Sequence, residues 1–293
     1  MRRAADSSRP VARSGAGPHT SPGNVRLRIA HKLIGIIALA AGLSVASFAA
    51  SADDKPPCQT KLDAVRLASP LTHLGVKLIR HQPVTIVAIG SSSTWGAGAS
   101  SREATYPSRL QAELKTQFPE SPITVINRGV SGEEVPDMLK RFDDAVVAAK
   151  PDLVIWQLGT NSVLRDHMSD QHSALIREGL KRIRATGADI VLIDPQFAPQ
   201  VISKAQAPRM VALIATTAKA ENVDLFPRFQ VMKQWAEGDH LAFGVFTSPD
   251  GLHMNDWGYA CFAQLLGDDI IQSVGQIKLG VNVPAEVRTY RPM

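Results

Sequence analysis

The sequence lacks most of the features that would indicate a metal or redox protein. It has only two cysteines, Cys58 and Cys261, among 293 residues, so no CxxC motif and no cysteine–histidine metal site can be assembled. His167 and His172 lie five residues apart and His240 stands alone, which does not form a metal-binding triad. We therefore expect no metal and no organic cofactor.

An excess of basic residues is also missing from most of the chain. The net charge is +5, but residues 1–52 hold seven basic residues and one acidic residue, leaving 25 basic and 26 acidic residues in 53–293. The high pI therefore belongs to the N-terminal segment. No basic surface for a phosphate backbone is predicted, and we expect no nucleic-acid partner.

Long hydrophobic runs are limited to one segment near the N-terminus. Residues 1–24 contain almost no large apolar residue and are expected to form a disordered extension, unless translation begins near Val25. Residues 25–52 have the order of a secretory signal peptide: basic residues, an apolar run from Leu33, and the A-x-A cleavage sequence at 50–52. This predicts an exported protein, either periplasmic or secreted. The alternative is an uncleaved membrane anchor over residues 33–50.

The rest of the chain predicts one α/β domain. Residues 53–83 form an N-terminal segment with a helix over 62–80 that is interrupted near Pro70, 84–276 the main domain, and 277–293 a C-terminal tail. Strands are predicted at 83–89, 123–127, 153–158, 190–194 and 223–226. Helices are predicted at 107–118, 133–149, 170–186, 205–221 and 255–273. This alternation predicts a three-layer α/β/α sandwich around a five-stranded parallel sheet, with ligands at the carboxyl ends of the strands.

The two cysteines allow one disulfide in an oxidising compartment. A bond between Cys58 and Cys261 would tie the mature N-terminus to the last helix. Two unpaired thiols are the alternative, and the sequence does not favour either.

A serine-rich turn follows the first predicted strand, with the sequence Gly90-Ser91-Ser92-Ser93-Thr94. It has neither the lysine of a phosphate-binding loop nor the second glycine of G-x-S-x-G, whose place Thr94 takes. An exposed nucleophilic serine and an ordinary solvated turn both fit this turn when it is considered alone.

Three further segments carry residues suited to acyl transfer. Asp250 precedes His253 by three residues, a spacing that lets a carboxylate orient an imidazole but also fits a helix cap. Gly129 follows the second strand and Asn161 the third, where an N–H group and an amide could stabilise an oxyanion or simply form turns.

Taken together, these four segments resemble the four sequence blocks of the SGNH (GDSL-like) hydrolase family over about residues 84–273. The resemblance implies a serine esterase with Ser92 as nucleophile, His253 as general base and Asp250 as its orienting partner. It also implies an oxyanion hole of Ser92 N–H, Gly129 N–H and the Asn161 side chain. Two positions depart from the family pattern, since Ser91 and Ser162 stand where the family usually has aspartate.

The expected substrate is an ester, carried by an acylated glycan or a lipid. An O-acyltransferase, a lysophospholipase or thioesterase, and a non-catalytic glycan-binding protein of the envelope are the alternatives. A membrane is expected as a partner only through an uncleaved leader.

Three tryptophans lie near the site blocks: Trp95, Trp156 and Trp257. They are interpreted as packing residues, with a sugar platform as the alternative. Phe243 and Phe246 border the acyl pocket or belong to the core.

Overall fold

The computed structural model of this chain describes residues 56–58, 66–169 and 171–279. The predicted extension (1–24), the signal peptide (25–52), residues 62–65 of the predicted first helix and the tail from residue 280 onward lie outside these ranges. The prediction of that helix is wrong for residues 66–71, which are not helical, and the helix extends only over Thr72–Ile79. No helix in the described ranges combines the length and hydrophobicity needed to cross a bilayer.

Five parallel strands in the described part form one sheet with the order β2-β1-β3-β4-β5. The strands are β1 (Val84–Gly90), β2 (Ile123–Gly129), β3 (Leu153–Gln157), β4 (Asp189–Ile193) and β5 (Asp224–Phe226). The central strands β1 and β3 are almost wholly buried, as expected for mainly apolar runs covered on both faces. The fold prediction is therefore confirmed.

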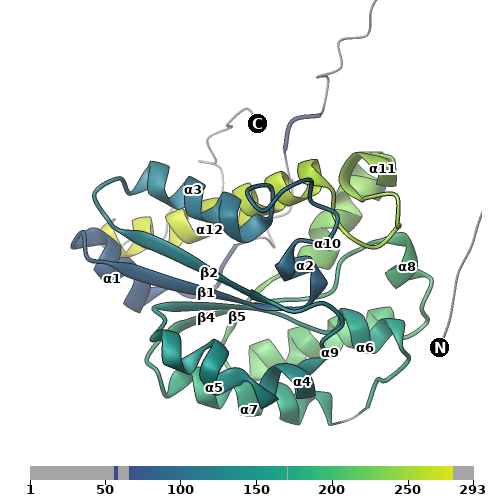
Figure 1. The fold of residues 1–293 in the computed structure, drawn as a ribbon, viewed down its shortest axis with the longest axis horizontal. Helices are drawn as coiled ribbons and strands as arrows, with labels where there is room; N and C mark the ends of the chain where they lie inside the picture. The colour runs from purple at the N-terminus through teal and green to yellow at the C-terminus, as the bar shows by residue number, and fades with distance from the viewer. Residues whose placement is uncertain (1–55, 59–65, 170, 280–293) are drawn as a thin grey trace, which may run out of the picture. The chain divides into compact units, whose positions relative to one another are not determined.

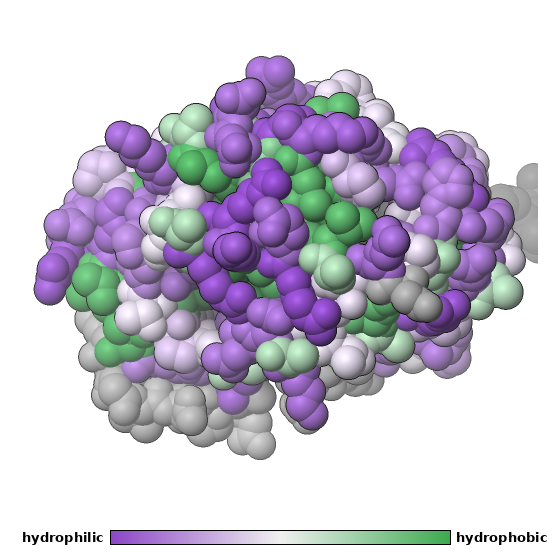
Figure 2. All heavy atoms as spheres, turned by 90° about the horizontal axis from the view of Figure 1, so that it is seen from below, coloured by the Kyte–Doolittle hydropathy of each residue, from purple (hydrophilic) through white to green (hydrophobic). Residues whose placement is uncertain are grey.

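Helices cover both faces of the sheet (Figure 1). One layer contains α1, α3 and α12, and the other contains α4, α5, α7 and α9. The outer surface of the second layer is mainly hydrophilic, with hydrophobic side chains showing between the polar ones (Figure 2). The longer helices are α1 (Thr72–Ile79), α3 (Tyr106–Gln117), α4 (Val135–Lys140), α7 (His172–Arg184), α9 (Ala207–Ala220), α10 (Arg228–Lys233) and α12 (Asp256–Leu279).

The carboxyl ends of the strands meet at one edge of the sheet, where several very short helices gather (Figure 1). Gly90 at the end of β1 pairs with Gly129 at the end of β2, so the turns after these two strands lie side by side. The short helices at this edge are α2 (Ser92–Trp95), α6 (Thr160–Leu164), α8 (Pro199–Ile202) and α11 (Phe243–Phe246), whereas the short α5 (Phe142–Ala145) lies in the second helix layer. Of these, α2, α6 and α8 directly follow β1, β3 and β4.

The single helix predicted over 133–149 is wrong. The chain forms α4, α5 and a 3-10 turn at Val147–Ala149. At Arg141 the backbone leaves the helical region, with φ −109° and ψ 11°. The Arg141 side chain pairs with Glu133 and donates to the Arg128 carbonyl at 2.8 Å, while Phe142 after it is fully buried. The break thus serves a local ion pair and a core contact that the apolar periodicity did not reveal.

A disulfide between Cys58 and Cys261 attaches the N-terminal segment to α12, with 5.2 Å between the Cα atoms. The Trp257 indole N–H also donates to the Pro56 carbonyl at 2.9 Å. The segment before α1 is held by the same helix, because Leu71 N–H donates to the Ser273 hydroxyl at 2.7 Å.

Candidate active site

Ser92 stands at the first residue of α2, immediately beyond the buried strand β1. The turn requires glycine at position 90, because a Cβ there would lie 2.3 Å from the Thr94 hydroxyl oxygen and 2.8 Å from Gln157 Oε1. After a single turn, α2 ends at Gly96, whose φ of 108° is readily adopted only by glycine. The sharp turn thus presents Ser92 at the strand-end edge.

Ser92, His253 and Asp250 form a continuous chain of hydrogen bonds. His253 Nε2 lies 2.8 Å from Ser92 Oγ, and His253 Nδ1 lies 2.6 Å from Asp250 Oδ2. The three residues come from segments 161 positions apart, so the fold brings them together. The imidazole can accept the serine proton while the carboxylate holds the ring in the required tautomer.

The Asp250 carboxylate is held in its ionised form by hydrogen bonds. Burial alone would raise its pKa, but donors from the Ser248 hydroxyl, the His253 ring and the Leu252 and His253 N–H groups outweigh burial and lower the pKa far below its usual range. Ser248 Oγ lies 2.6 Å from Asp250 Oδ1, and Leu252 N lies 2.9 Å from it. The negative charge that stabilises an imidazolium is therefore present at any pH at which the protein works.

The loop that carries the pair is also fixed from outside. Gln200 in α8 donates its amide to the Asp250 carbonyl at 2.7 Å and its backbone N–H to the Gly251 carbonyl at 3.0 Å. Ser248 N–H donates to the His253 carbonyl at 2.8 Å, which closes the loop at its base. The imidazole is thus oriented by backbone contacts as well as by the carboxylate.

Two residues expected in the oxyanion hole, Asn161 and Gly129, differ in whether they have an N–H free to donate. Asn161 stands in the first turn of α6, and its Nδ2 donates to the Glu133 carbonyl at 2.8 Å, which fixes the amide plane and leaves a second N–H available. The Gly129 N–H instead donates to Asn127 Oδ1 at 2.9 Å. This donor is therefore engaged within the protein.

Gly129 has another role, namely to allow close approach of α2. A Cβ at this position would lie 2.0 Å from the Trp95 nitrogen and 2.6 Å from the Thr94 carbonyl carbon. Asn127 completes the contact by donating to the Thr94 carbonyl at 2.8 Å. The end of β2 therefore positions the helix that carries Ser92.

Gly132 is a donor that the sequence reasoning missed. Its φ of 82° lies in the left-handed region, and within the described residues its N–H donates to no protein acceptor. Its carbonyl accepts from Arg165 at 2.8 Å, while the neighbouring Glu133 carbonyl holds Asn161. The free N–H thus belongs to the turn that already carries the Asn161 amide. The N-R-G-V-S-G sequence contains two glycines, and only the structure separates their roles.

A buried chain of amides connects the turns beneath the site. Gln157 Oε1 accepts from Ser91 N at 3.0 Å and from Ser91 Oγ at 3.1 Å. Thr160 Oγ1 donates to Gln196 Oε1 at 2.8 Å, and Gln196 Nε2 donates to the Leu252 carbonyl at 3.2 Å. Gln157 Nε2 and Thr160 Oγ1 join the two halves at 3.4 Å. The nucleophile turn, α6 and the histidine loop thus share one set of supports.

A buried charge completes this layer. Arg228 is 1% exposed and donates to Gln196 Oε1 at 2.9 Å and to the Asp194 carbonyl at 3.0 Å. Burial raises the pKa of Asp194 to about 7, against the lowering effects of the Phe229 N–H and the Arg228 charge. Nothing in the sequence pattern marked these residues as part of the site support.

The two departures from the family pattern have visible consequences. Ser91 is 2% exposed and bonded to Gln157, so a neutral serine–amide pair occupies the place of a carboxylate. Ser162 Oγ donates to Glu134 Oε2 at 2.8 Å, and Arg165 and His167 bind Oε1 of the same carboxylate at 2.8 and 2.9 Å. The acid on this side of the site is therefore supplied by Glu134, from the turn that also contains Gly132.

The aromatic residues near the site divide into two groups. Phe246 is fully buried against Trp235 and belongs to the core, and Phe243 stacks on Phe197 at 6.0 Å between ring centroids. Trp156 and Trp257 are likewise buried, at 0% and 3% exposure, whereas Trp95 is 59% exposed. Packing thus accounts for Trp156 and Trp257 but not for Trp95.

Two esterases share part of their sequence with this chain. An acetylxylan esterase from Geobacillus stearothermophilus is 30% identical over 94 residues, covering 29% of this chain and 43% of that protein. An arylesterase from Vibrio mimicus is 24% identical over 155 residues, covering 51% of this chain and 71% of that protein. The chain thus matches less than half the length of the first relative.

Solved structures share the fold. A two-domain esterase active on acetylated mannans has a TM-score of 0.62 at 20% identity, covering 80% of this chain and 61% of that one. A crystal structure of the Geobacillus acetylxylan esterase has a TM-score of 0.54 at 20% identity, covering 64% and 94%. Residues 57–276 match the Non-GDSL lipase-like family, and the chain therefore belongs to that family.

Proposed function

We propose that this protein is an exported serine esterase that removes acetyl groups from acetylated carbohydrates. The observation that carries the proposal is the hydrogen-bonded chain from Ser92 through His253 to Asp250. A serine Oγ at hydrogen-bond distance from an imidazole, itself oriented by a carboxylate, is the arrangement needed to generate an alkoxide nucleophile at neutral pH.

The reaction follows from this geometry in two steps. Ser92 Oγ attacks the ester carbonyl carbon while His253 Nε2 takes its proton, and His253 then gives that proton to the departing alcohol. Water next attacks the acyl–serine with His253 again as base, which releases the acid and restores the serine. The N–H groups of Ser92 and Gly132 and the Asn161 amide stabilise the oxyanion. Gly132 replaces Gly129 in this proposal because the Gly129 N–H is already bonded.

The relatives support the substrate class. The Geobacillus enzyme is an acetylxylan esterase, and the two-domain relative acts on acetylated mannans. Catalytic mutants of the Geobacillus enzyme change a serine, an aspartate and a histidine, and its aspartate lies three residues before its histidine. The same spacing separates Asp250 from His253. Export is supported by the predicted signal peptide and by the disulfide between Cys58 and Cys261, which forms in oxidising compartments.

The test is release of acetate from acetylated xylo-oligosaccharides, with p-nitrophenyl acetate as a simple ester. Ser92→Ala should lose activity on both substrates. The control Ser173→Ala, which replaces a serine of α7, should retain activity. A Ser92→Ala variant with wild-type turnover would overturn the proposal. Hydrolysis of the aryl ester without release of acetate from the glycan would instead indicate an arylesterase, as in the Vibrio relative.

A further inference from the structure

A cavity of about 640 Å³ lies beside the nucleophile helix and is distinct from the triad. Neither Ser92 nor His253 lines it, but Trp95 and Gly96 at the other end of α2 do. Ser92 and Trp95 are separated by one helical turn, or about 4.5 Å along the axis. The cavity thus begins about one helical turn from the nucleophile.

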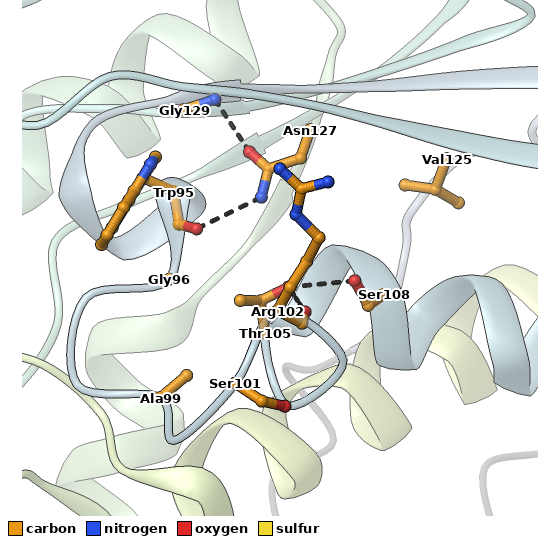
Figure 3. A pocket seen from close by; sticks show the side chains of 10 residues that line it. All are labelled: Trp95, Gly96, Ala99, Ser101, Arg102, Thr105, Ser108, Val125, Asn127 and Gly129. Atoms are coloured by element: carbon orange, nitrogen blue, oxygen red, sulfur yellow. Dashed lines mark hydrogen bonds between the residues drawn. The ribbon is translucent and has the colours of Figure 1, made fainter.

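The exposed Trp95 indole forms one wall of the cavity (Figure 3). At 59% exposure it is the most exposed large hydrophobic side chain of the described residues, in contrast to Trp156, Trp235 and Trp257, which are buried. A ligand with an apolar face that packs on the exposed indole removes apolar surface from water, which is favourable. The apolar face of a pyranose ring has the shape and polarity to stack on it.

Arg102 supplies the charge of the cavity. Its side chain rises from the loop after α2 across the cavity toward Asn127 (Figure 3), and it is the only ionisable side chain among the lining residues. No ion pair of Arg102 occurs among the described residues, and the exposed neighbour Glu103 does not line the cavity. A guanidinium in this setting is suited to a carboxylate ligand, which it can bind through two parallel hydrogen bonds.

The other polar groups of the cavity are neutral. Asn127 bonds Gly129 and the Thr94 carbonyl, and Thr105 Oγ1 donates to Ser108 Oγ at 3.2 Å, which leaves the Ser108 O–H available to a ligand. The Trp95 indole and the Arg102 guanidinium are thus the aromatic surface and the charge among the lining residues. We infer that this cavity is a binding subsite for a uronate residue of an acetylated glycan, with Trp95 stacking on the sugar ring and Arg102 binding its carboxylate. This inference rests on the proposed esterase function.

Binding can be measured separately from catalysis in the full-length Ser92→Ala variant. Because Trp95 is the exposed tryptophan of the four in the chain, acrylamide quenching of fluorescence reports mainly on it. A xylo-oligosaccharide with one glucuronate side group should reduce quenching and bind about fivefold more tightly than the same oligosaccharide without it, the size expected for an exposed charge pair. Adding Arg102→Gln should remove this preference, and Trp95→Phe should remove the fluorescence change. Equal affinity for the two sugars would overturn the inference.

Turnover gives a second readout. The ratio of kcat/KM for the acetylated uronate oligosaccharide to that for its acetylated neutral counterpart should fall about fivefold in Arg102→Gln. Lys115→Gln removes the same charge from an exposed position on α3 and should leave the ratio unchanged. The preference should also shrink when salt is raised from about 0.05 M to about 0.5 M. A ratio that is unchanged in Arg102→Gln would contradict the inference.

The two proposals can fail separately. Acetate release that depends on Ser92 but shows no preference for the uronate substrate would support the esterase function and overturn the uronate subsite. Activity that does not depend on Ser92 would overturn the proposed serine esterase function. The quenching experiment uses the Ser92→Ala variant, so it would still test whether the cavity binds a uronate.

Discussion

Replacing Gly129 with alanine should reduce esterase activity sharply, because it forces the nucleophile helix away from β2. The added Cβ would stand 2.0 Å from the Trp95 nitrogen, 2.6 Å from the Trp95 Cα and 2.6 Å from the Thr94 carbonyl carbon. These are backbone atoms, which cannot rotate away, and ordinary contact begins near 3.4 Å. The helix must therefore move by more than 1 Å. A misplacement of about 1 Å costs on the order of 100-fold in rate.

The assay is kcat/KM on p-nitrophenyl acetate, with the melting temperature measured beside it to confirm that the variant folds. Gly244→Ala is the matched control, because no atom lies within 4 Å of a Cβ at that position. The Gly129→Ala variant also distinguishes two possible roles of Gly129, oxyanion donor and site of close approach. Alanine retains the backbone N–H, so the variant would keep its activity if Gly129 acted only as a donor. A folded Gly129→Ala protein with nearly full activity would refute the close-approach argument.

Four further changes have expected outcomes. Asp250→Asn should lower kcat by about 10⁴, measured on the same ester, because an amide favours the wrong histidine tautomer; a loss under tenfold would count against the triad. Asn161→Ala should lower kcat by about 10² to 10³ with little change in KM, whereas a pure KM effect would place Asn161 outside the oxyanion hole. Paired replacement of Cys58 and Cys261 by serine should lower the free energy of unfolding by about 5 kcal/mol in chain-entropy terms, as measured in guanidinium chloride, because the bond closes a loop of 203 residues. The raised pKa of Asp194, about 7, means that its stabilising contribution is complete below pH 4 and is lost as the pH rises through 7. Asp194→Asn should flatten the pH dependence of unfolding over that range, and an unchanged slope would contradict the burial argument.

The layers and strands could be predicted because local pattern and burial agree there. Runs such as 84–89 and 153–158 are mainly apolar and almost wholly buried in the structure. The helix at 133–149 could not be predicted correctly, since the apolar periodicity does not mark the break at Arg141, where the backbone leaves the helical region beside the Arg141–Glu133 ion pair.

The candidate site divides in a similar way. The sequence predicted Ser92, His253 and Asp250 only when the four segments were considered together as a resemblance to the SGNH family, since each segment alone also fits an ordinary turn or a helix cap. The structure places the three side chains within hydrogen-bond distance of one another. The second donor was not predictable, because Gly129 and Gly132 lie in one short motif. Their different backbone conformations, neighbours and N–H partners appear only in the folded chain.

The supports of the site depend on long-range contacts. Arg228 lies 32 residues from Gln196, its hydrogen-bond partner, and nothing in its sequence neighbourhood distinguishes it from a surface arginine. Its burial and its role beneath the catalytic turns follow only from the folded arrangement.

The most direct test of the central claim is covalent labelling with a fluorophosphonate, followed by peptide mass mapping. Such a reagent reacts with a serine activated by a histidine. We predict one stoichiometric adduct on Ser92, much slower labelling in His253→Ala, and none at this position in Ser92→Ala. An unlabelled Ser92 in the folded wild-type protein, or an adduct formed at the same rate without His253, would contradict the central claim.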